Sequence, residues 1–97
     1  MPKIKNIHPG EILIEEFMEP LGLTAYRLAK ETHISQTRIS DIIKGKRGIS
    51  VDTALRLSKF FGNSPQFWLG IQSDYALEAE QRHLGKELVK IRQLKVA

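Results

Sequence analysis

Residues 24–47 read TAYRLAKETHISQTRISDIIKGKR, and this stretch predicts two short helices separated by a tight turn. Its second half carries isoleucines at helical rather than strand spacing, namely Ile39, Ile42 and Ile43. Thr24 and Ser35 each precede a predicted helix, where a side-chain oxygen can accept a hydrogen bond from an N–H of the first turn. Residues 31–34 have about the length of the turn in a helix-turn-helix, so the stretch predicts that motif.

The outward side of the second helix carries polar and basic side chains suited to DNA. If its isoleucines face inward, the residues expected at the DNA are Ser35, Gln36, Thr37, Arg38, Ser40, Asp41, Lys44, Lys46 and Arg47. Gln36 and Arg38 can make paired hydrogen bonds to a purine edge in the major groove. The basic cluster that closes the stretch is placed to meet phosphates. A lone polar helix face is more often merely solvated, but here the capped preceding helix, the short turn and the basic cluster favour a DNA-binding unit.

Length, composition and charge narrow the class of protein. The chain has 97 residues, 41% hydrophobic and 27% charged, which fits one globular domain. It has no cysteine, so disulfides and thiolate chemistry are excluded. Residues 1–20 lack a continuous apolar run, so we expect neither a signal peptide nor a membrane span, and a cytoplasmic location. The net charge is +4, and residues 27–47 hold six basic side chains against two acidic ones, which favours a polyanionic partner.

Prolines and serines mark the helix boundaries outside this stretch. A first helix is expected over residues 10–19, begun at Pro9 and stopped by Pro20. Two further helices with serine N-caps are expected over residues 51–61 and 65–82. The sequence therefore predicts an all-α domain of five helices.

The end of the chain allows two interpretations. Apolar and basic residues alternate over residues 89–92, as in a strand. Leu88, Ile91 and Leu94, however, are three residues apart, which also fits a helix. We expect an extended arm over about residues 83–97, attached to a helix-turn-helix core over about residues 9–82 of a single domain.

Aromatic residues gather at the start of the last predicted helix. Phe67, Trp68 and Tyr75 can form a patch for a partner, but aromatic side chains at helical spacing are more often part of a core. We expect Trp68 in the core, and Tyr75 is open to either interpretation.

The wider pattern resembles the HigA-type (VapI-like) antitoxins, a branch of the phage-repressor-like XRE helix-turn-helix proteins. The stretches that carry the resemblance are residues 7–13 (IHPGEIL), 21–24 (LGLT), 39–50 (ISDIIKGKRGIS), 54–57 (ALRL) and 64–75 (SPQFWLGIQSDY). The resemblance implies a homodimer that binds an inverted repeat in double-stranded DNA at its own promoter. It also implies a partner toxin, a RelE-like ribonuclease that cleaves mRNA. Asp41 departs from the family pattern, since a basic or amide side chain is more usual there; it can accept from a cytosine amino group, or orient Arg38 or Lys44.

Other classes of function find less support. His8, His33 and His83 are too dispersed for a metal site, and His33 is instead expected in a left-handed turn that histidine tolerates. No phosphate loop or nucleophile motif is present, so we expect neither an enzyme nor a cofactor. A stand-alone helix-turn-helix repressor without a toxin remains an alternative, as does a protein-interaction module that has lost DNA binding.

Overall fold

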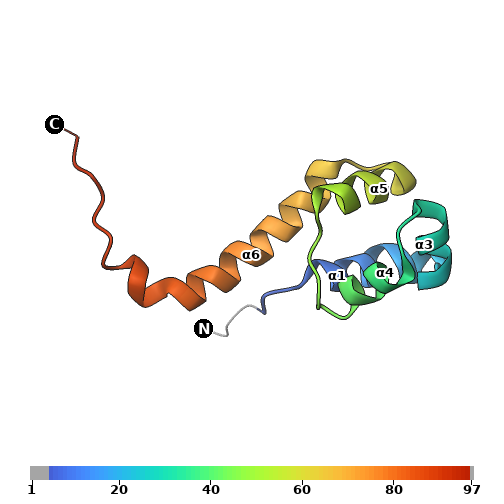
Figure 1. The fold of residues 1–97 in the computed structure, drawn as a ribbon, viewed down its shortest axis with the longest axis horizontal. Helices are drawn as coiled ribbons and strands as arrows, with labels where there is room; N and C mark the ends of the chain where they lie inside the picture. The colour runs from blue at the N-terminus through green and yellow to red at the C-terminus, as the bar shows by residue number, and fades with distance from the viewer. Residues whose placement is uncertain (1–4, 97) are drawn as a thin grey trace.

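The computed structural model describes residues 5–96, which fold into five helices and contain no strand (Figure 1). The first helix is continuous through three segments, α1 (Pro9–Ile12), the π-helical segment η1 (Leu13–Met18) and α2 (Glu19–Leu21). The remaining helices are α3 (Ala25–Thr32), α4 (Gln36–Ile43), α5 (Val51–Phe61) and α6 (Pro65–Leu88). This architecture confirms the predicted fold class. Within the described range, no helix is long and apolar enough to cross a membrane.

The first helix does not stop at Pro20, as the sequence predicted, but continues to Leu21. Proline inside a helix lacks an N–H, and its ring crowds the carbonyl four residues earlier. The helix accommodates it by widening into a π turn, in which the Glu19 N–H donates to the Ile14 carbonyl. The actual end is Gly22, whose φ of 63° lies in the left-handed region that closes helices.

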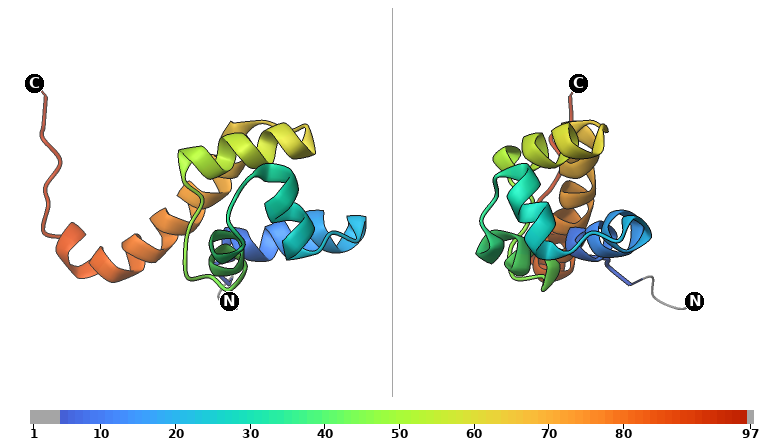
Figure 2. Two further views of the ribbon diagram at one scale, coloured as in Figure 1. Left: turned by 45° about the vertical axis from the view of Figure 1, so that its right-hand side comes forward. Right: turned by 90° about the vertical axis from the view of Figure 1, so that its right-hand side faces the viewer.

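The core lies where the first helix, α3, α4, α5 and the start of α6 meet. Its fully buried side chains include Leu13, Leu28, Ile39, Ile42, Leu57 and Trp68. Trp68 packs against Phe17 with ring centroids 4.8 Å apart, and its Nε1 donates to Asn63 Oδ1 at 2.9 Å. This burial confirms Trp68 as a core residue. In both turned views α5 lies above α3 and α4, the two helices of the predicted helix-turn-helix (Figure 2).

The start of the first helix lies directly against the end of α4. A Cβ atom built on Gly10 would lie 1.9 Å from the carbonyl oxygen of Ile42, closer than any side chain allows. Only glycine lets the two backbones approach in this way. The contact fixes the C-terminal end of α4 relative to the body of the protein.

The last helix is longer than predicted. α6 runs to Leu88 rather than Arg82, and only residues 91–96 lack regular structure, so the extended arm is shorter than the sequence suggested. Gly85 costs about 1 kcal/mol within a helix, but its neighbours are strong helix formers. The Arg82 Nε donates to Glu78 Oε1 at 2.7 Å, one turn away, which also favours the helix. The outer half of α6 runs away from the body of the protein (Figure 1).

Candidate nucleic-acid interface

The turn between α3 and α4 has the geometry of a helix-turn-helix. His33 ends α3 with φ 59° and ψ 34°, in the left-handed region, as predicted. The Ile34 N–H donates to the Ala29 carbonyl at 3.1 Å, and the Ile34 side chain is buried beneath the turn. Ser35 then begins α4, its Oγ accepting from the Arg38 N–H at 3.1 Å, which confirms the predicted N-cap. These local bonds set the two helices at a fixed angle.

The outer side of α4 is open to solvent. Ile39 and Ile42 are fully buried on its inner side, so the polar residues between them must turn outward. The exposed members of the predicted DNA-contacting set on this helix and just after it are Gln36, Thr37, Lys44, Lys46 and Arg47, and the partly exposed ones are Ser40 and Asp41. Within residues 5–96, Lys44 and Lys46 have no ion-pair partner, so both ammonium groups are available to an anion.

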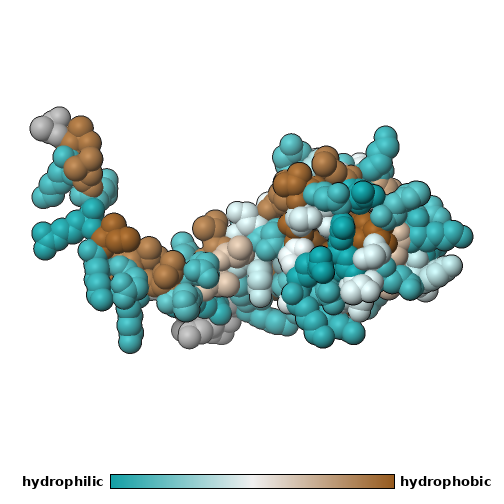
Figure 3. All heavy atoms as spheres, in the orientation of Figure 1, coloured by the Kyte–Doolittle hydropathy of each residue, from teal (hydrophilic) through white to brown (hydrophobic). Residues whose placement is uncertain are grey.

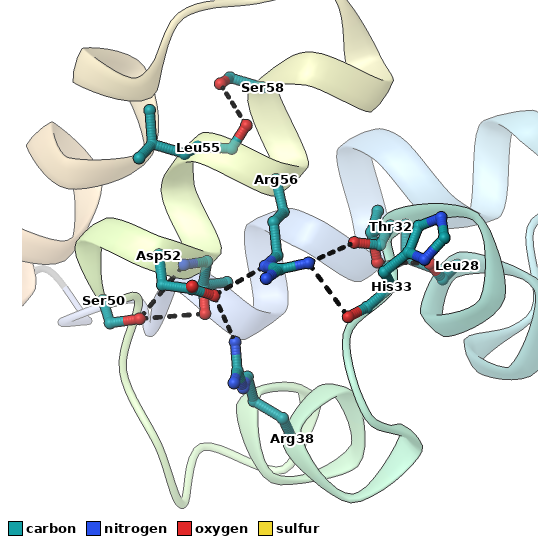
Figure 4. Close-up of polar contacts among 10 residues, drawn as sticks. Leu28, Thr32, His33, Arg38, Ser50, Asp52, Leu55, Arg56 and Ser58 are labelled. Carbon is teal, nitrogen blue, oxygen red and sulfur yellow. Dashed lines mark hydrogen bonds and ion pairs between the residues drawn. The ribbon is translucent and has the colours of Figure 1, made fainter.

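Arg38 is oriented differently from what its place in the sequence suggested. Its Nη1 lies 2.7 Å from Asp52 Oδ1, in the first turn of α5, rather than pointing outward from α4 (Figure 4). Arg56 donates through Nε to the same carboxylate oxygen at 2.9 Å. These two hydrogen bonds lower the pKa of Asp52, and the bond from Arg38 has the larger effect. In this conformation Nη1 of the Arg38 guanidinium is directed at Asp52.

Arg56 joins this network to the end of α3. Its Nη1 donates to the carbonyls of His33 at 3.2 Å and Thr32 at 3.4 Å (Figure 4). Carbonyls at a helix C-terminus lack partners within the helix and carry partial negative charge, so a guanidinium is favourable there. Asp52 and Arg56 therefore connect α3, α4 and α5. Sequence reasoning missed both residues, although their spacing of four on one helix was a usable signal.

Asp41 pairs with neither Arg38 nor Lys44, the two partners proposed for it from the sequence. Its Oδ2 lies 3.5 Å from Arg47 Nη2, in the loop that follows α4. The Asp41 carbonyl also accepts from the Lys46 N–H at 2.8 Å. Asp41 therefore orders the basic loop next to α4.

A side chain of α6 holds the far end of this loop. Gln72 Oε1 accepts from the Ile49 N–H at 2.7 Å. A Cβ on Gly48 would lie 2.5 Å from the same oxygen, so glycine makes room for the Gln72 amide. Gln72 was also missed from the sequence, since nothing local connects it to a loop more than twenty residues earlier.

His8 caps the first helix next to α6. Its Nδ1 accepts from the Gly10 N–H at 2.9 Å, and its ring meets the Tyr75 ring edge-on, with centroids 4.9 Å apart. Burial lowers the pKa of His8, with a smaller opposing effect from Glu11. Tyr75 thus packs against the start of the first helix, at the point where α6 extends beyond the body of the protein. Within residues 5–96, no group of His, Asp and Glu side chains could hold a metal ion.

The fold and the exposed α4 define a helix-turn-helix protein of the DNA-binding class. The chain matches the Helix-turn-helix family over residues 14–68. It therefore belongs to this family, of XRE type, and within it to the group of HigA-type antitoxins and virulence-associated proteins. Members of this group are DNA-binding regulators and antitoxins rather than enzymes.

Three similar proteins document this membership. Virulence-associated protein I of Dichelobacter nodosus is 54% identical over 76 residues, which cover 77% of this chain and 70% of the relative. The structure of the antitoxin HigA of Pseudomonas aeruginosa with the higBA promoter is 38% identical with a TM-score of 0.90, covering 94% of this chain and 100% of that one. The structure of an addiction module antidote protein of the HigA family from Coxiella burnetii has 41% sequence identity and a TM-score of 0.87. The match covers 95% of this chain and 100% of that one.

Proposed function

We propose that this protein is a cytoplasmic antitoxin that represses its own operon and neutralises a RelE-like, mRNA-cleaving toxin. The observation that carries the DNA-binding part is the solvent-exposed outer side of α4, followed by Lys44 and Lys46, which have no ion-pair partner in the part of the chain that the structure describes. The likeness to a HigA solved with promoter DNA supports the same kind of ligand. The target is an inverted repeat in double-stranded DNA.

The structure favours a division of labour among the residues at the DNA. Gln36 and Thr37 lie at the exposed start of α4, the end of a recognition helix that usually meets base edges. We assign base reading to these two residues and to Ser40, and phosphate contacts to Lys44 and Lys46. Arg47 and Asp41 shape the loop, and Ser35 holds the helix start.

Fluorescence anisotropy tests this division on the DNA upstream of the protein's own reading frame, against a scrambled duplex. Gln36→Ala should weaken operator binding by about 5- to 150-fold, the cost of one good base contact, and leave the scrambled duplex unaffected. Lys44→Ala should weaken binding to both duplexes. It should also make the slope of log affinity against log salt shallower by about 0.9. Lys59→Ala, an exposed lysine near the end of α5, is the control with the same charge change. Equal affinity of the wild type for both duplexes would exclude the proposed operator.

We propose that the protein acts as a homodimer joined through the outer half of α6. The chain exposes 7396 Å², whereas a compact monomer of 11.1 kDa exposes about 5,700 Å². The difference exceeds the roughly 800 Å² that each partner contributes to a standard interface. Apolar side chains are exposed along the outer part of α6 and the tail (Figure 3). Leu77, Leu84 and Leu88 lie along one side of the helix with 56%, 36% and 43% exposure.

Charge along the same segment favours a second copy as the partner. Residues 74–80 hold three acidic side chains and no basic one, whereas residues 82–95 hold five basic and one acidic. Two copies packed antiparallel therefore place the acidic part of one against the basic part of the other. A two-fold pair of this kind also suits an inverted repeat, since the symmetry of the operator mirrors that of the dimer.

Light scattering after gel filtration tests the dimer. Leu84→Asp should give a monomer with retained helix content in the body. Leu21→Asp, at the end of the first helix and more exposed than Leu84 (63% against 36%), should stay dimeric. A wild-type monomer at micromolar concentration would refute the homodimer. A Leu84→Asp variant that stays dimeric would place the interface elsewhere.

The toxin is tested by co-expression with the neighbouring reading frame. Growth arrest by that frame, relieved by this protein and by its Lys44→Ala variant, would separate toxin binding from DNA binding. Operator binding without any such rescue would identify a stand-alone repressor.

A further inference from the structure

The ion-pair network around Asp52 offers little stability for its size. The Arg38 and Asp52 side chains are 31% and 53% exposed, and exposed ion pairs contribute little to stability because water screens the charges. Arg56, one turn away, already supplies Asp52 with a cation. The contact to Arg38 therefore has a consequence other than stability, because it fixes where a guanidinium of the recognition helix points.

The carboxylate of Asp52 offers Arg38 what a DNA phosphate would offer. Guanidinium groups donate to carboxylate and phosphate oxygens with the same fork geometry. Arg38 lies at the edge of the outer side of α4, beside Gln36 and Thr37, within reach of a backbone that α4 would approach. As long as Nη1 of Arg38 donates to Asp52, this guanidinium is paired with a protein carboxylate rather than with a DNA phosphate.

We propose that Asp52 is a specificity-determining residue that acts as an internal substitute for phosphate and keeps Arg38 from non-specific DNA. In the operator complex Arg38 stays on Asp52 while the exposed residues of α4 read the bases. On other DNA, where those residues find no matching edges, a released Arg38 adds a phosphate contact that does not depend on sequence. This inference rests on the proposed operator binding.

The prediction is a gain of non-specific binding when Asp52 loses its charge. Asp52→Asn should raise affinity for a scrambled duplex by roughly three- to tenfold and steepen its salt slope by about 0.9, the value for one phosphate contact. Operator affinity should change much less, so the ratio of specific to non-specific affinity falls. Thermal stability should be nearly unchanged, since the pair is exposed.

Arg38→Ala distinguishes this effect from the mere loss of a negative charge near DNA. In the Arg38→Ala background, Asp52→Asn should no longer raise non-specific affinity, because the gain comes from the released guanidinium. Glu11→Gln, which breaks the exposed Lys5–Glu11 pair at the start of the first helix, is the matched control and should leave binding to both duplexes unchanged.

Each outcome of this double-mutant cycle decides one question. A gain of non-specific affinity that persists without Arg38 would overturn the inference, as would an Asp52→Asn variant that loses operator affinity and thermal stability together. A wild type that shows no preference for the operator would instead refute the proposed function. A gain that requires Arg38, with operator binding retained, supports the role of Asp52.

Discussion

Replacing Gly10 with alanine tests how α4 is held in place. The new Cβ would lie 1.9 Å from the Ile42 oxygen and 2.8 Å from its carbonyl carbon. Both are backbone atoms, so no rotamer change can relieve the contact. The first helix must move away by more than 1 Å to restore ordinary contact, which opens the packing between α1 and α4. Overpacking a rigid site with loss of neighbouring contacts should cost about 3–5 kcal/mol of the free energy of unfolding.

The assay for this prediction is urea unfolding followed by circular dichroism. A loss of about 3–5 kcal/mol corresponds to a fall of about 15–25 °C in Tm for a domain of this size. Gly70→Ala is the matched control, because its Cβ would meet no atom within 4 Å on exposed α6. That variant should gain about 0.5–1 kcal/mol, since alanine favours the helix. If Gly10→Ala unfolds within about 0.5 kcal/mol of the wild type, the close approach does not hold α4 and the reasoning fails.

Three further substitutions test local features of the fold. His8→Asn keeps a cap acceptor without a titrating ring. Because the folded pKa of His8 is lowered, the wild type should be fully stable above about pH 6.5 and lose stability as pH falls through the lowered pKa, and urea midpoints at pH 7.5 and 5 should differ less in the variant. Gly48→Ala should cost about 1–2 kcal/mol by displacing the Gln72 amide, and much less in a Gln72→Ala background; simple additivity in this double-mutant cycle would contradict the contact. Ser35→Ala should cost about 1 kcal/mol by removing the N-cap of α4, and an unchanged unfolding midpoint would contradict that role.

Features encoded within a few residues could be predicted from the sequence. The N-caps Thr24 and Ser35 and the left-handed His33 depend only on neighbouring N–H and carbonyl groups, and the structure confirms all three. The isoleucine spacing of α4 likewise fixed which of its sides is buried. The exposed part of the candidate site follows from that spacing alone.

Features that depend on a distant partner could not be predicted in this way. The guanidinium of Arg38 is a group that can contact bases, but its orientation is set by Asp52 on the next helix, fourteen residues later. The Gln72 contact joins α6 to the loop after α4. The end of the first helix was also predicted wrongly. The rule that proline stops a helix does not consider a π turn, which here accommodates Pro20.

In the homodimer proposed above, the order of the outer half of α6 depends on protein concentration. The ion pairs given for the helix beyond Tyr75, Glu78–Arg82 and Glu87–Lys90, lie within α6 and the turn that follows it. A segment of this length is only marginally helical by itself, so its folding draws on whatever binds it. Its backbone amides should exchange with deuterium rapidly in dilute solution and slowly once copies associate. If the proposed dimer forms, the amount of protein in the cell sets how much of this outer half is folded at any moment.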